Sequence, residues 1–183
     1  PMSINIVDAT IELSDEYDVP IILIASRRQI DSSEFNGGYV NNWSTDAYSE
    51  YVNTKCRKKK IILARDHGGP WQNNKEKIEK YSLRQAMESC KDSYKVDISA
   101  GFQILHIDTS VDIFGVPSVS TVIDRACELY EFCWSCAQQL GQEIVFEIGT
   151  EEQTGTTSTL EELEHTLERI IEFCGRNNLP KPT

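Results

Sequence analysis

Residues Lys60–Gln72 read KIILARDHGGPWQ, and this stretch decides the fold class. Its first half is a short apolar run with the length of a buried strand, and it stops at an acid and a histidine, Asp66 and His67. Two glycines and a proline follow at residues 68–70 and predict a break in the backbone. The stretch is therefore a buried strand with a polar end, which is either an ordinary polar turn or the rim of an active site.

Three more apolar runs resemble this one, and helical patterns separate them. The other expected strands are Val19–Ser26, Phe102–Asp108 and Glu143–Thr150. The expected helices are Ile4–Tyr17, Ser44 or Thr45 to Lys59, Lys75–Asp92, Val119–Leu140, and a last one capped by Thr159 and ended by Gly175. A helix followed by four strand–helix units predicts an α/β fold with a parallel sheet and helices packed outside it.

Composition limits the classes of function. The 183 residues suit one domain over residues 1–183, and no change in composition divides them. The net charge of −11 argues against nucleic acid and against an anionic membrane surface as partners. No run of about eighteen apolar residues and no signal peptide is visible, and six scattered cysteines suit reduced thiols. We therefore expect a cytoplasmic protein.

Polar residues gather where the predicted strands end. In parallel α/β folds the carboxyl ends of the strands form the ligand-binding face. The candidates at this face are Arg27, Arg28 and Gln29 after the first strand, Asp66 and His67 after the second, His106, Asp108 and Ser110 at the third, and Glu151 after the fourth. Gly37 and Gly38 lie in a loop that could offer backbone N–H groups to a phosphate.

His106 and Asp108 are two residues apart on one strand, so their side chains point the same way. Imidazole and carboxylate groups converging in a partly dry site suit either metal binding or proton transfer. The alternative is a purely structural role, in which both side chains hydrogen-bond to neighbouring residues inside a barrel. From the sequence, the pair supports both interpretations.

Four blocks carry a family resemblance. They read FNGGYVNNWSTDAYSEYV, IILARDHGGPWQ, AGFQILHIDTS and EIGTEEQTG, and the resemblance around them extends from the first predicted helix to the last. Their order and spacing resemble the non-catalytic, GatZ/KbaZ-like subunit of class II D-tagatose-1,6-bisphosphate aldolase. That resemblance implies a TIM-barrel-like (β/α)8 fold, of which four strand–helix units and a leading helix are about half. It also implies a separate, zinc-dependent catalytic aldolase subunit as partner.

The resemblance also suggests roles for individual residues. The Asp-His pair is similar to the pair in catalytic class II aldolases, which makes Asp66 the proton-transfer group and His67 a ligand of Zn²⁺ or another divalent metal, with His106 as a second ligand. Asp108 and Glu151 are further candidate acid–base residues. Arg27 and Arg28 depart from the resemblance, since the family tends to carry an acid at the end of the first strand. Two arginines there would suit a phosphate or carboxylate of the substrate, and Gln29, Gly37, Gly38 and Ser110 are further candidate binding residues.

Two functions remain open at this point. The first is an accessory subunit that supports the activity and stability of a catalytic aldolase subunit in carbohydrate metabolism. The second is a metal-dependent aldolase or epimerase that itself acts on a sugar phosphate. Half a barrel leaves two strand edges and one apolar face uncovered, so we also expect an oligomer.

Overall fold

The structure is a computed structural model that describes residues 3–149 and 159–182. Most of this chain lies in helices and strands, which alternate along the sequence. They are α1 (Ile4–Tyr17), β1 (Ile21–Ser26), η1 (Ser33–Phe35), α2 (Thr45–Lys55), β2 (Ile61–Asp66), α3 (Asn74–Ile78), α4 (Leu83–Ser99), β3 (Ile104–Asp108), α5 (Val119–Leu140), β4 (Val145–Gly149) and α6 (Leu160–Asn177).

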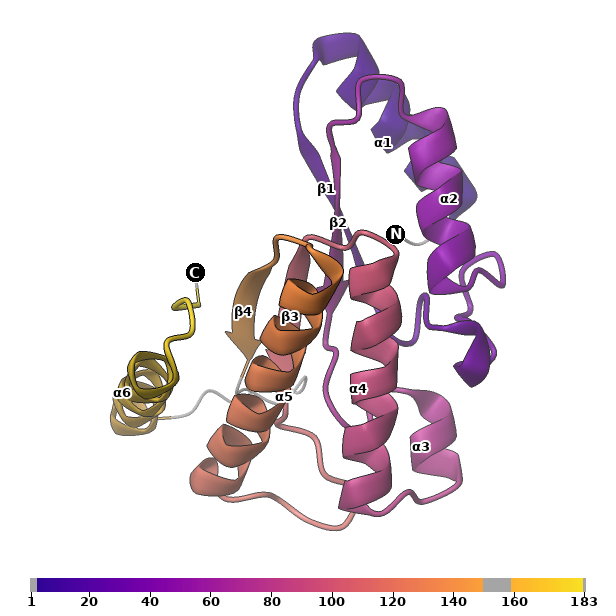
Figure 1. Cartoon of the computed structure of the whole chain (residues 1–183). Coiled ribbons are helices and arrows are strands. Elements are labelled where there is room, and N and C mark those ends of the chain that lie inside the picture. Colours follow the sequence, from indigo (N-terminus) through magenta and orange to yellow (C-terminus); the bar gives the residue numbers. More distant parts are fainter. Residues whose placement is uncertain (1–2, 150–158, 183) are drawn as a thin grey trace.

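The four strands form one parallel sheet in the order β1-β2-β3-β4, which confirms the predicted fold class. The helices pack beside one another in the same order, α1 on α2, α2 on α4, α4 on α5 and α5 on α6. Figure 1 shows α4 and α5 lying along the sheet, with α6 at its far end beyond β4. This is the arrangement of a partial TIM-like barrel, and it brings all four carboxyl strand ends to one edge.

The two faces of the sheet differ in what covers them. Leu63 and its cross-strand partner Leu23 are buried, as are Leu105 and its partner Phe146, and they join the core beneath the helices. Side chains alternate between faces along a strand, so Ile24 and its neighbours in register lie on the opposite face. Ile24 is 51% exposed. The helix-covered face is a packed core, and none of the described helices covers the other face.

Three of the predicted helices have other bounds in the structure, and one of them also extends further, since α4 ends at Ser99 rather than at Asp92. The expected helix Lys75–Asp92 is two helices, because Lys80 adopts a left-handed backbone and Ser82 starts α4 with a capping box to Gln85. Gly175 does not end the last helix, which continues to Asn177 and stops at the left-handed Asn178. The predicted capping box of Thr159 with Glu162 is confirmed.

The second helix also ends early. It stops at Lys55 because Asp15 of α1 takes over the next backbone N–H groups, those of Arg57 and Lys58. The basic run at residues 57–60 thus lies in a loop whose backbone hydrogen-bonds to α1. Within the described ranges, no helix combines the length and apolar character needed to cross a membrane.

Two arginines at the carboxyl half of the sheet are completely buried. Arg65 of β2 donates to both carboxylate oxygens of Asp97 at 2.7 Å and to the carbonyls of Ala25 and Ile30. Its guanidinium is therefore saturated by partners within the core. Burying a charge in this way is tolerated only when its hydrogen bonds are filled, so this ion pair links β2 to α4 specifically. The second buried arginine, Arg27, lies beside the candidate site and is described with it.

Candidate functional site

Four of the predicted site residues meet at the carboxyl ends of β2 and β3. His67 Nδ1 lies 2.6 Å from Asp108 Oδ2, and His106 Nδ1 lies 3.2 Å from Asp66 Oδ1. The centroids of the two imidazole rings are 5.1 Å apart. Asp66, His67, His106 and Asp108 therefore form one cluster, called the rim cluster below. Residues 150–158, and Glu151 with them, lie outside the described part of the chain.

Asp108 orients His67. Its carboxylate is completely buried and also accepts hydrogen bonds from Gln72 Nε2 and from the N–H and hydroxyl of Ser110. The hydrogen bond from His67 to Asp108 raises the pKa of the imidazole, although burial opposes that rise. With Nδ1 engaged, Nε2 is the His67 atom that faces Asp66, at 3.7 Å from Oδ1.

His106 presents its own Nδ1 to the same place. When this nitrogen carries no proton, it accepts the backbone N–H of His67 at 3.3 Å and is in the form that can also bind a metal. When it carries a proton, it donates to Asp66 instead, and this hydrogen bond is the main cause that lowers the pKa of Asp66. The ring lies against Gly149 of β4, where a β-carbon would come within 2.1 Å of Nε2. Glycine at this position therefore makes room for the imidazole.

The rim cluster has the composition and spacing of a metal site. One potential ligand atom from each of Asp66, His67 and His106 lies within 4.8 Å of the others. Two imidazoles and a carboxylate are a ligand set that suits Zn²⁺, Mn²⁺ or Fe²⁺. The buried Asp108 behind His67 is the carboxylate partner that metal-binding histidines generally have. These residues could therefore hold a divalent cation.

The backbone after β2 explains how adjacent residues reach one site. His67 itself adopts a left-handed backbone, with φ at 44°, and Trp71 does so too. Gly68 and Gly69 were predicted to break the backbone, but in the structure they allow the loop to pack closely against its neighbours. A β-carbon on Gly69 would lie 1.5 Å from the Asp108 carbonyl oxygen, and one on Gly68 would meet the Tyr94 ring. The loop therefore packs closely against β3 and α4, and this packing places His67 next to Asp108.

A hollow lies beside the rim cluster. It is bordered by Ser26, Arg28, Gln29, Tyr39, Asp66 and His67, has a volume of about 380 Å³, and is called the site hollow below. The side chain of Asp66 is 37% exposed, so a ligand in the hollow can reach its carboxylate. The structure thus brings Arg28 and Gln29 to the site as the sequence predicted, and it adds Tyr39.

Arg27 does not belong to this site. Its guanidinium is buried, 3.0 Å from Asp31 and 2.6 Å from Glu76, and it also donates to the Gly69 carbonyl. Adjacent residues at the strand end point in different directions, so only Arg28 faces the hollow. In this geometry the contacts of Arg27 hold α3 against the loop after β1, and substrate binding by Arg27 stays a prediction.

The predicted glycine loop also has another role. The N–H of Gly37 donates to the Ser32 carbonyl and that of Gly38 to the Trp43 carbonyl, so neither is offered to a phosphate. A β-carbon on Gly38 would lie 2.0 Å from the Gln29 carbonyl oxygen. These glycines shape the loop that carries Tyr39. Ser110, likewise, contacts Asp108 rather than open space.

The sequence analysis missed several residues at this edge. Gln72 contacts Asp108 directly, and Tyr39 borders the site hollow. Lys77 is half-buried on α3, and its pKa is lowered by burial and then by the positive charge of Arg28. No strand-end pattern marks these residues, because all three come from loops or a one-turn helix. Trp71 is fully buried and donates to the Tyr81 carbonyl, so it is a packing residue.

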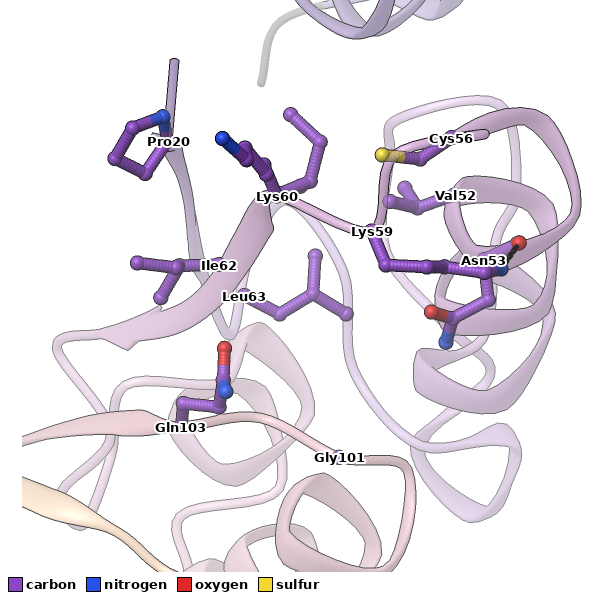
Figure 2. Close-up of a pocket in the computed structure, with 11 residues that line it drawn as sticks. Pro20, Val52, Asn53, Cys56, Lys59, Lys60, Ile62, Leu63, Gly101 and Gln103 are labelled. Carbon is purple, nitrogen blue, oxygen red and sulfur yellow. Dashed lines mark hydrogen bonds between the residues drawn. The ribbon is translucent and has the colours of Figure 1, made fainter. Parts of the chain in front are cut away.

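A second hollow lies at the opposite end of the strands. Figure 2 shows it between Pro20, Lys60, Ile62 and Gln103, and its volume is about 420 Å³. It opens because β2 pairs with β3 only from Ala64 onward. Ligand sites in parallel α/β folds lie at carboxyl strand ends, so this hollow is at the wrong end for the reaction chemistry.

The sequence matches the family described as D-tagatose-1,6-bisphosphate aldolase subunit GatZ/KbaZ-like over residues 3–173. The chain belongs to this family. The matched range contains the whole rim cluster and the loop that borders the site hollow.

The fold is similar to a solved structure, that of a probable tagatose 6 phosphate kinase from Sinorhizobium meliloti 1021. The TM-score is 0.72 at 21% sequence identity, and the likeness covers 94% of this chain. It covers 42% of that protein, so the present chain spans less than half of its length. At this identity the likeness shows the fold, and it agrees with a partial TIM-like barrel.

Proposed function

We propose that the chain acts as an accessory subunit of a class II tagatose-1,6-bisphosphate aldolase, supporting the activity and stability of a separate catalytic subunit in the cytoplasm. The observation that carries the proposal is the family match over residues 3–173, whose description names an aldolase subunit. The acidic surface expected from a net charge of −11 suits binding to another protein rather than to nucleic acid.

The test of this role measures the catalytic subunit with and without the chain. A catalytic class II aldolase subunit should lose less tagatose-1,6-bisphosphate cleavage activity during incubation at raised temperature when the chain is added, and the two should co-elute. A chain unfolded by heating before it is added serves as the control. Identical decay curves with native and with unfolded chain would remove the accessory role.

The geometry favours a second candidate, a metal-dependent aldolase or epimerase that acts on a sugar phosphate. Asp66 and His67 border the site hollow and converge with His106, and no accessory role requires that convergence. A divalent metal held by the two histidines would polarise the substrate carbonyl. Asp66, whose carboxylate is accessible and ionised at neutral pH, stands beside them to accept a proton.

Metal content and activity separate the two candidates. The second candidate predicts that the chain retains stoichiometric Zn²⁺ or Mn²⁺ after gel filtration and cleaves or epimerises a sugar phosphate without another subunit. His106→Gln should lose both properties. A chain that binds no metal and has no activity alone, yet protects a catalytic subunit, would leave only the accessory role.

A further inference from the structure

The hollow at the amino ends of the strands, called the amino-end hollow below, lies away from the rim cluster (Figure 2). The end of α2, the start of β2 and the segment before β3 border it. Its volume of about 420 Å³ lies within the range of small-molecule sites, which is roughly 300–1,000 Å³. Its border combines apolar side chains, amides and amines, and it includes Asn53, Lys59, Ile61, Ile62, Gly101 and Gln103.

The backbone of Ile61 faces this hollow with no strand opposite it. The carbonyl of Leu63 accepts the N–H of Gln103, so it points toward β3. Backbone groups alternate in direction along a strand, and the N–H and carbonyl of Ile61 therefore point the same way as those of Leu63. The ladder between β2 and β3 begins only at Ala64. Ile61 thus presents one donor and one acceptor of an inner strand to the hollow.

Lys59 is a cation at this border that pairs with no carboxylate of the described residues. Its neighbours in sequence, Lys58 and Lys60, both pair with Asp18. The Lys59 ammonium donates instead to the backbone carbonyl of Asn53, which leaves two of its three N–H bonds for another acceptor. Among the described residues, none that borders the hollow is acidic. An anion beside Lys59 would therefore gain a charge-assisted hydrogen bond.

The backbone of Lys59 holds its side chain at the hollow. Its φ is 55°, which is uncommon for a residue other than glycine and persists only where the surroundings impose it. Figure 2 shows the Lys59 side chain running toward Asn53, while that of Lys60 leaves in another direction. The left-handed residue thus separates two adjacent lysines, one at the hollow's polar side and one bound to Asp18.

We infer that the amino-end hollow binds a small organic carboxylate that carries an amide and an apolar side chain, as an N-acylated amino acid does. The carboxylate would bind the Lys59 ammonium, and the amide would pair with the backbone N–H and carbonyl of Ile61. The apolar part would pack against the half-buried side chains of Ile61 and Ile62. This site lies at the end of the strands opposite the rim cluster, and it is independent of the proposed function.

The test titrates the full chain with N-acetyl-leucine, which contains all three groups, after a chelator has removed any metal that could bind the carboxylate. A ligand of this size should bind with a dissociation constant of about 1 mM. In amide NMR spectra the signals of Ile61 and Gly101 should shift and then saturate. N-acetyl-leucinamide lacks the negative charge and should bind about tenfold more weakly. N-acetylglycine lacks the apolar side chain and should also bind more weakly than N-acetyl-leucine.

Two variants assign the carboxylate to its partner. In Lys59→Gln the acid and its amide should bind equally weakly, because the preference for the acid depends on the Lys59 ammonium. Lys58→Gln is the matched control, since it removes the same charge from a neighbouring residue that does not border the hollow. It should keep the roughly tenfold preference for the acid. The thermal unfolding midpoint of each variant shows that the chain remains folded.

Three results would overturn the inference. They are equal binding of the acid and the amide by the wild type, an equal loss of the preference in both variants, and shifts caused by the probe that leave Ile61 unchanged. A chain that supports a catalytic aldolase subunit but gives one of these results keeps the proposed function and loses this site. A chain that gives no such support, but prefers the acid only when Lys59 is present, keeps the site and loses the proposed function.

Discussion

The Nδ1 atom of His67 lies 2.6 Å from Oδ2 of the buried Asp108, and this contact decides which nitrogen of His67 faces Asp66. Asp108→Asn replaces one acceptor oxygen by an NH₂ group where all neighbouring groups donate. The affinity for Zn²⁺ should fall about 10- to 100-fold, as is typical when the partner of a metal-binding histidine is lost. Metal titration measures the loss, and nitrogen NMR of the His67 ring should show a changed tautomer.

The same chemical change on the surface provides the control. Asp124→Asn alters an exposed carboxylate of α5 and should leave both the zinc affinity and the His67 spectrum as in the wild type. An Asp108→Asn protein with wild-type zinc affinity would show that Asp108 has a packing role only and does not influence His67 as a metal ligand.

Gly149 makes a second test of the rim cluster from the neighbouring strand. A β-carbon at this position would meet Nε2 of His106 at 2.1 Å, so Gly149→Ala must displace the ring. We expect weaker metal binding, by about tenfold, and a loss of stability of about 1–3 kcal/mol from overpacking. Metal titration and urea unfolding measure the two effects, and wild-type values for both would contradict the placement of His106.

Gly175→Ala is the matched control for that substitution. Gly175 lies inside α6 with open space beside its α-carbon, since nothing beyond the helix backbone lies within 4 Å of where a β-carbon would stand. Replacing a mid-helix glycine by alanine should stabilise the protein by about 0.5–1 kcal/mol and leave metal binding unchanged.

The buried ion pair between Arg65 and Asp97 should be far more important for stability than any surface pair. Asp97→Asn leaves a buried guanidinium without its counter-charge, and we expect a loss of about 3–5 kcal/mol in urea unfolding. The double variant Arg65→Met/Asp97→Leu should recover most of that loss. As a control, Glu172→Gln breaks the exposed pair with Arg176 and should cost less than about 0.5 kcal/mol.

Asp15 gives the fold a defined sensitivity to acid. The backbone N–H groups of Lys58 and Arg57 lower the pKa of this carboxyl, so its folded value lies below the unfolded one. The stabilisation is therefore present above about pH 3.9 and is lost as the pH falls through the folded pKa. Asp15→Asn should be less stable than the wild type at pH 7, and the difference should shrink below about pH 4. A constant difference across that range would contradict this assignment.

The strands and the cluster could be predicted because both follow from local patterns. Short apolar runs located the four strands within a few residues, and parallel order placed Asp66, His67, His106 and Asp108 at one edge. The His-Asp spacing on β3 was sufficient to predict that the two side chains point the same way. For these elements, local sequence and the rules for parallel sheets agree.

The failures arose where the outcome depends on contacts between distant residues. Arg27 and Arg28 are identical in type and adjacent, and only the positions of Asp31 and Glu76 make one buried and the other a border of the hollow. Gly175 resembles a helix terminator, yet the helix continues because its neighbours suit a helical backbone. Lys77 lies within the predicted helix Lys75–Asp92, but a helical pattern does not place it near Arg28, and this proximity became visible only in three dimensions.

The open face of the sheet predicts association. β1 and β4 are the edges, and Ile24 and Val145 on their uncovered sides are 51% and 46% exposed. Unpaired strand edges beside apolar side chains pair readily with other chains. We expect the chain to self-associate at micromolar concentration and to dissociate on dilution, as followed by sedimentation velocity.

Charge at an edge strand should prevent this association. Val145→Lys places an ammonium group on the uncovered face of β4 and should weaken self-association by about tenfold or more, because pairing would bury that charge. Val116→Lys adds the same charge at a valine that is 87% exposed in the loop before α5, and it should associate like the wild type. If the wild type is instead a monodisperse, thermally stable monomer at micromolar concentration, the open face does not drive association. Equal association of the wild type and both variants would place the contact elsewhere on the surface.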